Sequence, residues 1–229
     1  MTTTAAILVG GKGTRLQSVI SDVPKSLAPI AGEPFLYLLL RHLKSAGIQR
    51  VILLTGYMHD KIQAACGDGS LFGLDIIYSQ EPTPLGTGGA LWHGRSYLSS
   101  QNSFLLLNGD SYIDNPLTEF IQQPLEKDAI GIIGAIRSEE YERYGSLLID
   151  KDQFITGFFE KSQKNTGLVN AGIYKFSSKL LEMINGPSSL EYDVFPYLIN
   201  HGHLLAAHLL EGKFTDIGTP ESYLAFNPP

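Results

Sequence analysis

Hydrophobic residues in the first 136 positions occur in short continuous runs rather than in alternation with polar residues. Continuous runs of this length are typical of strands that are buried on both faces of a sheet. They predict strands at residues 5–9, 50–55, 74–79, 103–108 and 129–136.

The stretches between these runs show helical spacing of apolar residues. They predict helices at residues 33–47, 58–66 and 87–98. The first has Pro34 near its start and Gly47 at its end, as helices commonly do. Alternation of strands and helices at this interval indicates a mostly parallel sheet with right-handed crossovers.

The pattern loosens after residue 136. Residues 146–161 predict two strands around the turn DKDQ. Further strands are expected at 168–176, 204–210 and 213–218, and a helix at 190–200 in spite of Pro196. Because there is no linker, repeat or low-complexity segment, we expect the second half to fold against the first.

Composition excludes several classes of protein. Of the 229 residues, 43 % are apolar and 17 % are charged, which is ordinary for a soluble globular domain. Seventeen basic against 23 acidic residues argue against a nucleic-acid or membrane binder, although not against a small anionic ligand. The single cysteine, Cys66, rules out an internal disulfide and a cysteine metal cluster. With no signal peptide and no long apolar run, the cytoplasm is the expected location.

The segment LVGGKGTRL, residues 8–16, follows the first strand where we expect a helix to begin. Ligands of open α/β sheets bind beyond the carboxyl ends of the strands. Gly10, Gly11 and Gly13 allow backbone amides to approach a ligand closely there. Converging amides at a helix N-terminus bind anions, so the segment predicts a phosphate site.

Two familiar phosphate motifs do not fit this segment. A Walker A loop needs Ser or Thr after Gly-Lys, but Lys12 is followed by Gly13. A dinucleotide fingerprint that starts at Gly11 needs a glycine where Leu16 stands. A tight turn without a ligand is the alternative, and Arg15 favours the phosphate site because its forked cation suits a phosphate.

Several further motifs carry a resemblance to a known family. The segment GGKGTRL and the following PKSLAPIAGEPFL are similar to the signature of the sugar-1-phosphate nucleotidylyltransferases. The later motifs occur in the family's order: LGTGGAL, NGDSYID, FFEK, NAGIYKF and FTDIGTPESY. The resemblance covers nearly the whole chain. SLEYDVFP and the short length most resemble the heptose-1-phosphate guanylyltransferases.

The resemblance implies one three-layer, Rossmann-like α/β domain with a mixed, mostly parallel sheet and a small β-rich sugar-binding part. Residues 1–136 would form mainly the nucleotide-binding half and residues 137–229 mainly the sugar-phosphate-binding half. The implied reaction transfers GMP from GTP to D-glycero-alpha-D-manno-heptose 1-phosphate, giving GDP-heptose and pyrophosphate. Such transfers are catalysed mainly by positioning and charge stabilisation.

The resemblance also assigns roles to residues. Arg15 would bind the triphosphate and Lys25 the α-phosphate as the catalytic cations, although a lone lysine is otherwise a solvated charge. The implied nucleotide-binding residues are Leu8, Gly10, Gly11, Gly13, Thr14, Glu81 and Gly86. The implied sugar-phosphate-binding residues are Gly88, Asn108, Glu160, Lys161, Asn170 and Gly172. Asp110 and Asp216 would hold Mg²⁺, which prefers one or two carboxylates plus water and phosphate oxygens.

By the resemblance, Glu81 stands near where the family reads the base. A carboxylate accepts from the N1–H and 2-amino group of guanine together, and uracil and thymine lack that donor pair, so Glu81 favours guanine. A loop charge without a ligand is the alternative. The chain departs from the family's motifs at three places. Ser26 replaces the proline usual after the lysine, Lys12 adds a cation, and prolines interrupt EPTPLGTGG on the base side.

Alternatives remain open: transfer of a uridylyl or guanylyl group to N-acetylmuramate or mannose 1-phosphate, or a non-catalytic sugar-nucleotide sensor. Joint presence of the catalytic cations and both aspartates argues against a sensor. We expect no nucleic-acid or membrane partner, and homo-oligomer formation is open.

Overall fold

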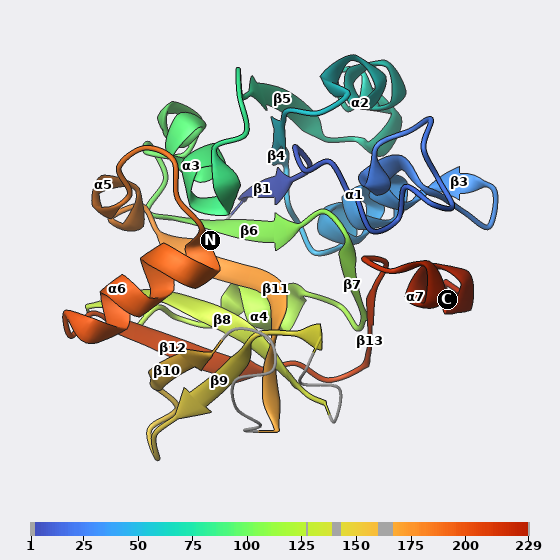
Figure 1. The fold of residues 1–229 in the computed structure, drawn as a ribbon. Helices are drawn as coiled ribbons and strands as arrows, with labels where there is room; N and C mark the ends of the chain where they lie inside the picture. Colours follow the sequence, from blue (N-terminus) through green and yellow to red (C-terminus); the bar gives the residue numbers. More distant parts are fainter. Residues whose placement is uncertain (1–2, 127, 139–142, 160–166, 229) are drawn as a thin grey trace.

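The computed structural model describes residues 3–126, 128–138, 143–159 and 167–228. Its main strands are β1 Thr4–Leu8, β4 Arg50–Thr55, β5 Asp75–Gln80, β6 Ser103–Asn108, β8 Ala129–Arg137, β9 Ser146–Ile149, β10 Ile155–Phe159, β11 Leu168–Ser177 and β12 Leu204–Leu209. Within the described residues these nine strands form one sheet in the order β10-β9-β11-β6-β1-β4-β5 (Figure 1). Off that path, β8 pairs with β11 and β12 pairs with β8.

The sheet changes character at β11. The first half is parallel, since β1 pairs in parallel with β4 and β6, and β4 with β5. β11 then runs antiparallel to both β6 and β8. The mixed sheet predicted from the sequence is confirmed, and the carboxyl ends of β1, β4, β5 and β6 share one edge.

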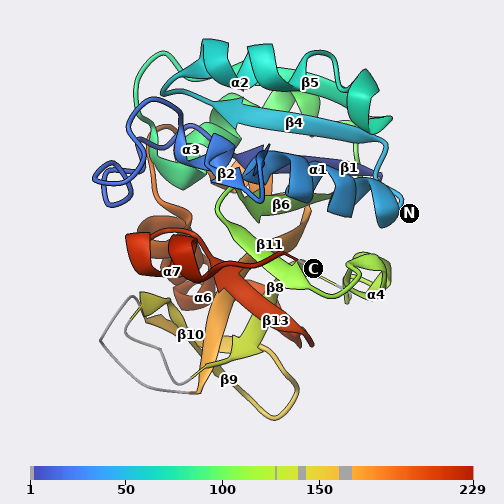
Figure 2. The same cartoon turned by 90° about the vertical axis from the view of Figure 1, so that its right-hand side faces the viewer.

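Helices cover both faces of this sheet (Figure 2). They are α1 Phe35–Ser45, α2 His59–Cys66, α3 Gly86–His93, α4 Thr118–Gln122, α5 Leu180–Met183, α6 Phe195–Asn200 and α7 Pro220–Ala225. One cluster of buried apolar side chains draws on α1, α2 and α4, and the other on α3, α5 and α6. The expected three layers are confirmed. No helix in the described part of the chain is long and apolar enough to cross a membrane.

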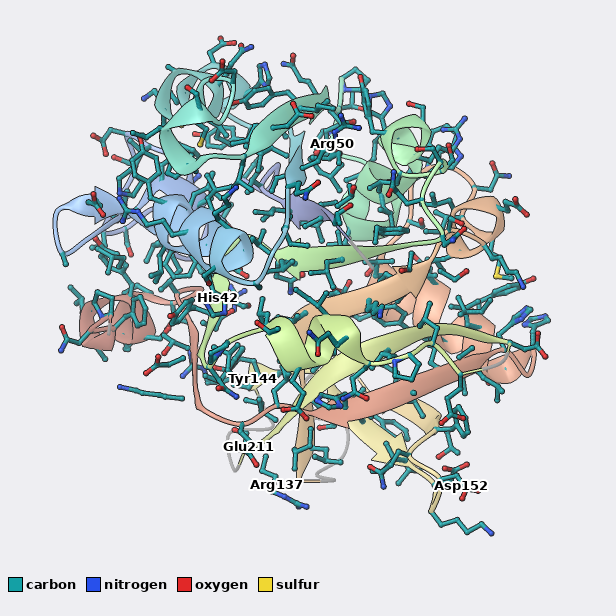
Figure 3. All side chains as sticks on the ribbon, turned by 180° about the vertical axis from the view of Figure 1, so that it is seen from behind. His42, Arg50, Arg137, Tyr144, Asp152 and Glu211 are labelled. Atoms are coloured by element: carbon teal, nitrogen blue, oxygen red, sulfur yellow. The ribbon has the colours of Figure 1, made fainter. Side chains whose placement is uncertain are left out.

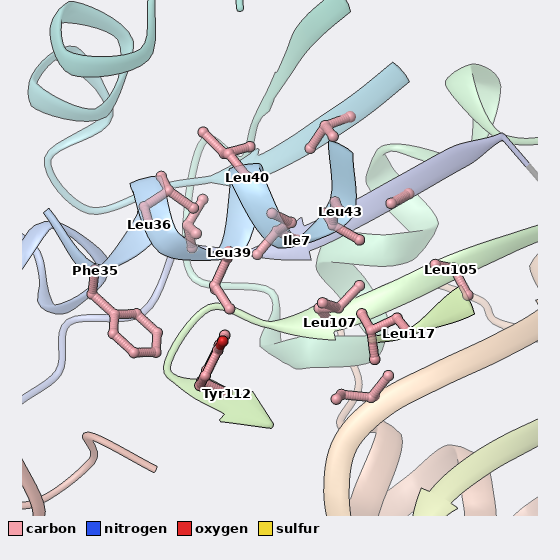
Figure 4. Close-up of a cluster of buried hydrophobic side chains, with 14 of the residues drawn as sticks. Ile7, Phe35, Leu36, Leu39, Leu40, Leu43, Leu105, Leu107, Tyr112 and Leu117 are labelled. Carbon is pink, nitrogen blue, oxygen red and sulfur yellow. The ribbon is translucent and has the colours of Figure 1, made fainter. Parts of the chain in front are cut away.

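Helix α1 shows how the sequence builds the core. Leu36, Leu39, Leu40 and Leu43 recur at helical spacing and are at most 1 % exposed. They face the sheet beside Ile7 of β1 (Figure 4). Each buried leucine stabilises the fold by roughly 1.5–3 kcal/mol, so this face holds α1 firmly against the strands that position the site.

Shorter elements escaped the sequence analysis. They are β2 Pro29–Ile30, β3 Glu33–Pro34, β7 Ser111–Asp114, and the 3₁₀ helices Lys25–Leu27 and Ser70–Phe72. The strand expected at 213–218 is β13 Lys213–Asp216, and the end of the helix expected at 87–98 is the 3₁₀ helix Arg95–Tyr97. The helix expected at 190–200 begins with a π-helical turn at Leu190–Val194 and continues as α6. Pro196 is the second residue of α6, in its first turn, where a helix tolerates proline best.

Candidate active site

A cleft of about 790 Å³ opens at the shared carboxyl edge of β1, β4, β5 and β6. We call it the main cleft. Residues singled out from the sequence that line it are Leu8, Gly10, Gly11, Gly13, Lys25, Glu81, Gly86, Asn108 and Asp110. Segments far apart in the sequence therefore meet at one site, as the strand order requires.

The glycine loop forms one wall of the main cleft. Gly13 has φ +59°, and a Cβ there would lie 2.9 Å from the Cβ of Lys25. A Cβ on Gly10 would lie 3.0 Å from Oε1 of Glu81, whereas Gly11 faces open space. Because these glycines have no side chains, the loop can pass close to Lys25 at one end and to Glu81 at the other. Its backbone is thereby exposed to the cleft.

The helix expected after this loop is absent. Residues 14–19 form turns, with the amide of Leu16 donating to the carbonyl of Gly13 at 2.9 Å. Leu16 is the one buried residue among them, so an amphipathic helix has no apolar face to bury. The expectation of a helix was wrong, and any anion binding here relies on loop amides and side chains rather than on a helix dipole.

Lys25 and Asp110, which both line the main cleft, form an ion pair. Lys25 Nζ donates to Asp110 Oδ2, and the hydroxyl of Ser111 donates to Oδ1 at 3.2 Å. Burial opposes the charge of Asp110, but the attraction of Lys25 and its hydrogen bond outweigh burial and lower the pKa of Asp110. The carboxylate is therefore stabilised in its ionised form.

Asp216 reaches the same place through a two-stranded ribbon. β13 pairs antiparallel with β7, which sets Asp216 opposite Ser111, and the amide of Ile217 donates to the carbonyl of Asp110 at 2.9 Å. Burial and then repulsion by Asp110 raise the pKa of Asp216. Two carboxylates from distant motifs converge, and their mutual repulsion creates a place where a cation is favoured.

Arg15 lies close to this pair although it is solvent-exposed. Its positive charge lowers the pKa of Asp110 and opposes the rise in the pKa of Asp216. Arg15 and Asp216 do not line the main cleft itself but flank the end of it that Lys25 occupies. Thr14, next to Arg15, is exposed on the turn that follows the glycine loop.

Glu81 lies at the other end of the glycine loop. Its Oε2 accepts from the amide of Leu85 at 3.0 Å, and a Cβ on Gly56 would lie 2.6 Å from Oε1. Burial raises the pKa of Glu81. Gly56 and Tyr57 also line the cleft, and neither was predicted from the sequence. The strand-end rule could have found them, because they directly follow β4.

The glycines of LGTGGAL differ in their surroundings. Gly86 lines the main cleft. The amide of Gly88 donates to the carbonyl of Ser188 at 2.9 Å, and a Cβ on Gly88 would lie 2.6 Å from the hydroxyl of Ser188. Gly88 is buried, and its amide, which was expected to bind the sugar, already donates a hydrogen bond within the protein.

Asn108, Asn170 and Gly172 form a group where β6 meets β11. Asn108 lines the main cleft, and its buried Oδ1 has no hydrogen-bond partner among the described residues. Gly172 has φ +69°, and a Cβ there would lie 2.6 Å from Nδ2 of Asn108. Asn170 accepts from the amide of Gly172 at 3.0 Å and donates to the hydroxyl of Tyr174 at 2.8 Å. Asn108 thus offers the free acceptor of the group.

Glu160 and Lys161, which the sequence analysis assigned to the sugar phosphate, lie outside the described residues.

Comparison with known proteins gives a consistent picture. The sequence model of the Nucleotidyl transferase family matches residues 4–228. A D-glycero-alpha-D-manno-heptose 1-phosphate guanylyltransferase from Campylobacter jejuni is 36 % identical over 224 residues, covering 97 % of each chain. The catalytic subunit beta of a mannose-1-phosphate guanylyltransferase from Drosophila pseudoobscura is 37 % identical, and the alignment covers 97 % of this chain but 61 % of that protein.

Solved structures share the whole fold. HddC from Yersinia pseudotuberculosis superposes with a TM-score of 0.85 at 35 % identity, covering 97 % of each chain. The structure of HddC complexed with GMP-PN superposes with a TM-score of 0.84.

Proposed function

This chain belongs to the nucleotidyl transferase family, and we propose that it transfers GMP from GTP to D-glycero-alpha-D-manno-heptose 1-phosphate. The products are GDP-heptose and pyrophosphate. Two observations on relatives favour the heptose. The Campylobacter heptose enzyme and this chain cover 97 % of each other, whereas this chain spans 61 % of the Drosophila mannose enzyme.

The convergence of Lys25, Asp110 and Asp216 at one end of the main cleft is the observation that carries the proposal. The reaction joins two polyanions, so charge must be neutralised where they meet. In a chain of net charge −6, the few cations must be concentrated at that point. Lys25 and Arg15 meet this requirement from two different segments.

The chain's own groups account for the chemistry. An oxygen of the sugar 1-phosphate attacks the α-phosphorus of GTP. The bond between that phosphorus and the oxygen that bridges the α- and β-phosphates breaks. Pyrophosphate leaves with the electron pair. Arg15 and the amides of the glycine loop hold the leaving phosphates, while Lys25 offsets the charge that develops on the α-phosphate.

Asp110 and Asp216 suit Mg²⁺, since two carboxylates with water and phosphate oxygens match its preferred ligands. Burial and then repulsion by Asp110 raise the pKa of Asp216, and a bound cation would offset both. When bound, the ion would neutralise phosphate charge. No group of three or more His, Cys, Asp or Glu within the described residues could form a metal cage without substrate.

For the base, Glu81 is the proposed acceptor of guanine N1–H and the 2-amino group. It lies on the opposite side of the glycine loop from Lys25, with Gly10 beside Glu81 and Gly13 beside Lys25. A nucleotide lying along the loop would therefore place its base and its phosphates at these two ends.

The test is a pyrophosphate-release assay with GTP, UTP, ATP and dTTP against heptose, mannose and N-acetylmuramate 1-phosphates. We expect turnover with GTP and the heptose 1-phosphate at the highest kcat/KM. Turnover with UTP alone would contradict the proposed base. Mannose 1-phosphate as the best acceptor would support the second candidate, which the 37 % identity to the mannose enzyme favours.

The substitution Asp110→Asn distinguishes an enzyme from a sensor that binds the nucleotide without reacting. In an enzyme this change abolishes turnover more than it weakens GTP binding. Asp114→Asn is the matched control, because Asp114 is exposed at the far end of β7. Absence of pyrophosphate release from the unaltered protein with every substrate pair, together with intact GTP binding, would identify a sensor.

A further inference from the structure

Ser26 carries a buried hydroxyl that the chemistry above does not use. The residue is 5 % exposed, and its Oγ has no hydrogen-bond partner among the described residues. Ser26 also lines the main cleft. A buried hydroxyl without a partner is unfavourable, and native proteins rarely leave one so placed.

The backbone around Ser26 fixes where this hydroxyl lies. Pro24 is extended and precedes the short 3₁₀ helix Lys25–Leu27, whose turn is closed by the amide of Leu27 donating to the carbonyl of Pro24 at 2.8 Å. Leu27 is 7 % exposed and anchors the turn in the core. Ser26 is therefore held next to Lys25 by local structure.

Of the three buried side-chain polar atoms without a hydrogen-bond partner in the described residues, two belong to residues that line this cleft: Ser26 Oγ and Asn108 Oδ1. They differ chemically. An amide oxygen only accepts, so Asn108 Oδ1 suits a substrate hydroxyl and cannot bond a phosphate oxygen. A serine hydroxyl can donate, so Ser26 suits an anion.

We propose that Ser26 Oγ donates a hydrogen bond to a non-bridging oxygen of the α-phosphate of the bound nucleoside triphosphate. This inference rests on the proposed function. The α-phosphate is the fitting acceptor because Ser26 shares its short helix with Lys25, which contacts Gly13 and Asp110 at the phosphate end of the cleft. Ser26 then acts as a substrate-contacting residue beside the lysine.

The first experiment compares Ser26→Ala with Ser177→Ala. Ser177 ends β11 opposite Ser103, at the edge of the sheet away from the cleft. Because hydrogen bonds to charged groups are the stronger kind, we expect Ser26→Ala to lower kcat/KM for GTP by about 10- to 100-fold. Ser177→Ala should leave it unchanged. Unaltered kinetics in Ser26→Ala would overturn the proposal.

The second experiment locates the contact on the substrate. The two diastereomers of GTPαS each replace one non-bridging α-oxygen with sulfur, a weaker acceptor. We expect the loss caused by Ser26→Ala to shrink for one diastereomer and to persist for the other. An equal loss with GTP and both diastereomers would indicate a packing role and overturn the α-phosphate contact.

Dissociation constants of GTP and of the two GTPαS diastereomers, measured for the unaltered protein and for Ser26→Ala, keep this inference separate from the proposed function. If no sugar phosphate supports turnover, the proposed reaction fails, while the dependence of GTP and GTPαS affinity on Ser26 still tests the contact. Ser26→Cys, a near-isosteric change to a weak donor, replaces Ser26→Ala if the alanine variant does not fold. It should show an intermediate loss, and full affinity for all three nucleotides would overturn the contact.

Discussion

Lys25 Nζ donates a hydrogen bond to Oδ2 of Asp110, a residue 85 positions further along the chain. This pair holds Asp110 ionised in spite of burial. It leaves Asp216 as the neighbouring carboxylate whose charge is disfavoured. The site therefore contains one satisfied carboxylate and one that a further cation would stabilise.

Lys25→Met tests the importance of this lysine for catalysis. Loss of a cation aimed at the developing charge should lower kcat by about 10²–10³-fold. Lys12→Met is the matched control, because Lys12 is an exposed cation that also lines the main cleft. We expect it to weaken GTP binding by less than about tenfold, with kcat unchanged. Steady-state kinetics of both variants would check this, and equal losses of kcat would contradict a specific role for Lys25.

Asp216→Asn tests the cation site by stability rather than activity. Without metal, the variant should be more stable than the unaltered protein, since burial and Asp110 disfavour the charge it removes. Mg²⁺ at about 100 times its Kd should raise the unfolding free energy of the unaltered protein by about 2.7 kcal/mol, and that of the variant by much less.

Thermal unfolding at constant ionic strength measures both effects. Asp152→Asn, in the turn between β9 and β10 (Figure 3), is the control and should respond to Mg²⁺ like the unaltered protein. An equal response in Asp216→Asn would remove that residue from the proposed site.

The sequence was sufficient to predict the parallel half of the sheet, because buried parallel strands leave continuous apolar runs. It also placed Asp110 at the carboxyl edge, directly after β6. The meeting of Asp110 with Asp216 depends on the four-residue ribbon of β7 and β13. The residue pattern predicted the strand at 213–218 but not β7, and it does not show which strands pair, so the expectation of convergence came from the family resemblance.

Glycines were the other weak point. Gly13 and Gly88 both lack side chains because something approaches closely: the side chain of Lys25 in one case and the segment at Ser188 in the other. A motif does not tell whether the close neighbour is a ligand or the protein itself. Likewise, the helix after the glycine loop failed because tertiary contacts bury a single residue there, Leu16.

His42 should make stability depend on pH. It lies on α1 (Figure 3). Its ring centroid is 5.2 Å from that of Tyr112, and its buried Nε2 has no hydrogen-bond partner among the described residues. Burial lowers the pKa of His42 below its ordinary value of 6.5. The unfolded chain then binds the proton first as pH falls. Stability is therefore fully present above pH 6.5 and is lost below it, by at most about 1.4 kcal/mol per pH unit.

The free energy of unfolding, measured with denaturant at several pH values, checks this prediction. In His42→Leu, the loss of stability below pH 6.5 that His42 causes should disappear. His201→Gln is the control, because His201 is exposed and stacks on Tyr197. A decline of the same size in His42→Leu would show that other groups cause it.

Glu81→Gln tests how the base is selected. If Glu81 accepts both N1–H and the 2-amino group of guanine, the unaltered protein should prefer GTP to ITP, which lacks that amino group. Glutamine keeps the shape and can still accept from the amide of Leu85, now held by Oε2 at 3.0 Å. It replaces one acceptor oxygen with a donor, so kcat/KM for GTP should fall by about 10- to 100-fold and the preference over ITP should nearly vanish. Competition assays with the two nucleotides measure the ratio directly. A preference that survives the substitution would show that other groups in the cleft read the base and that Glu81 serves only to hold the turn at Leu85.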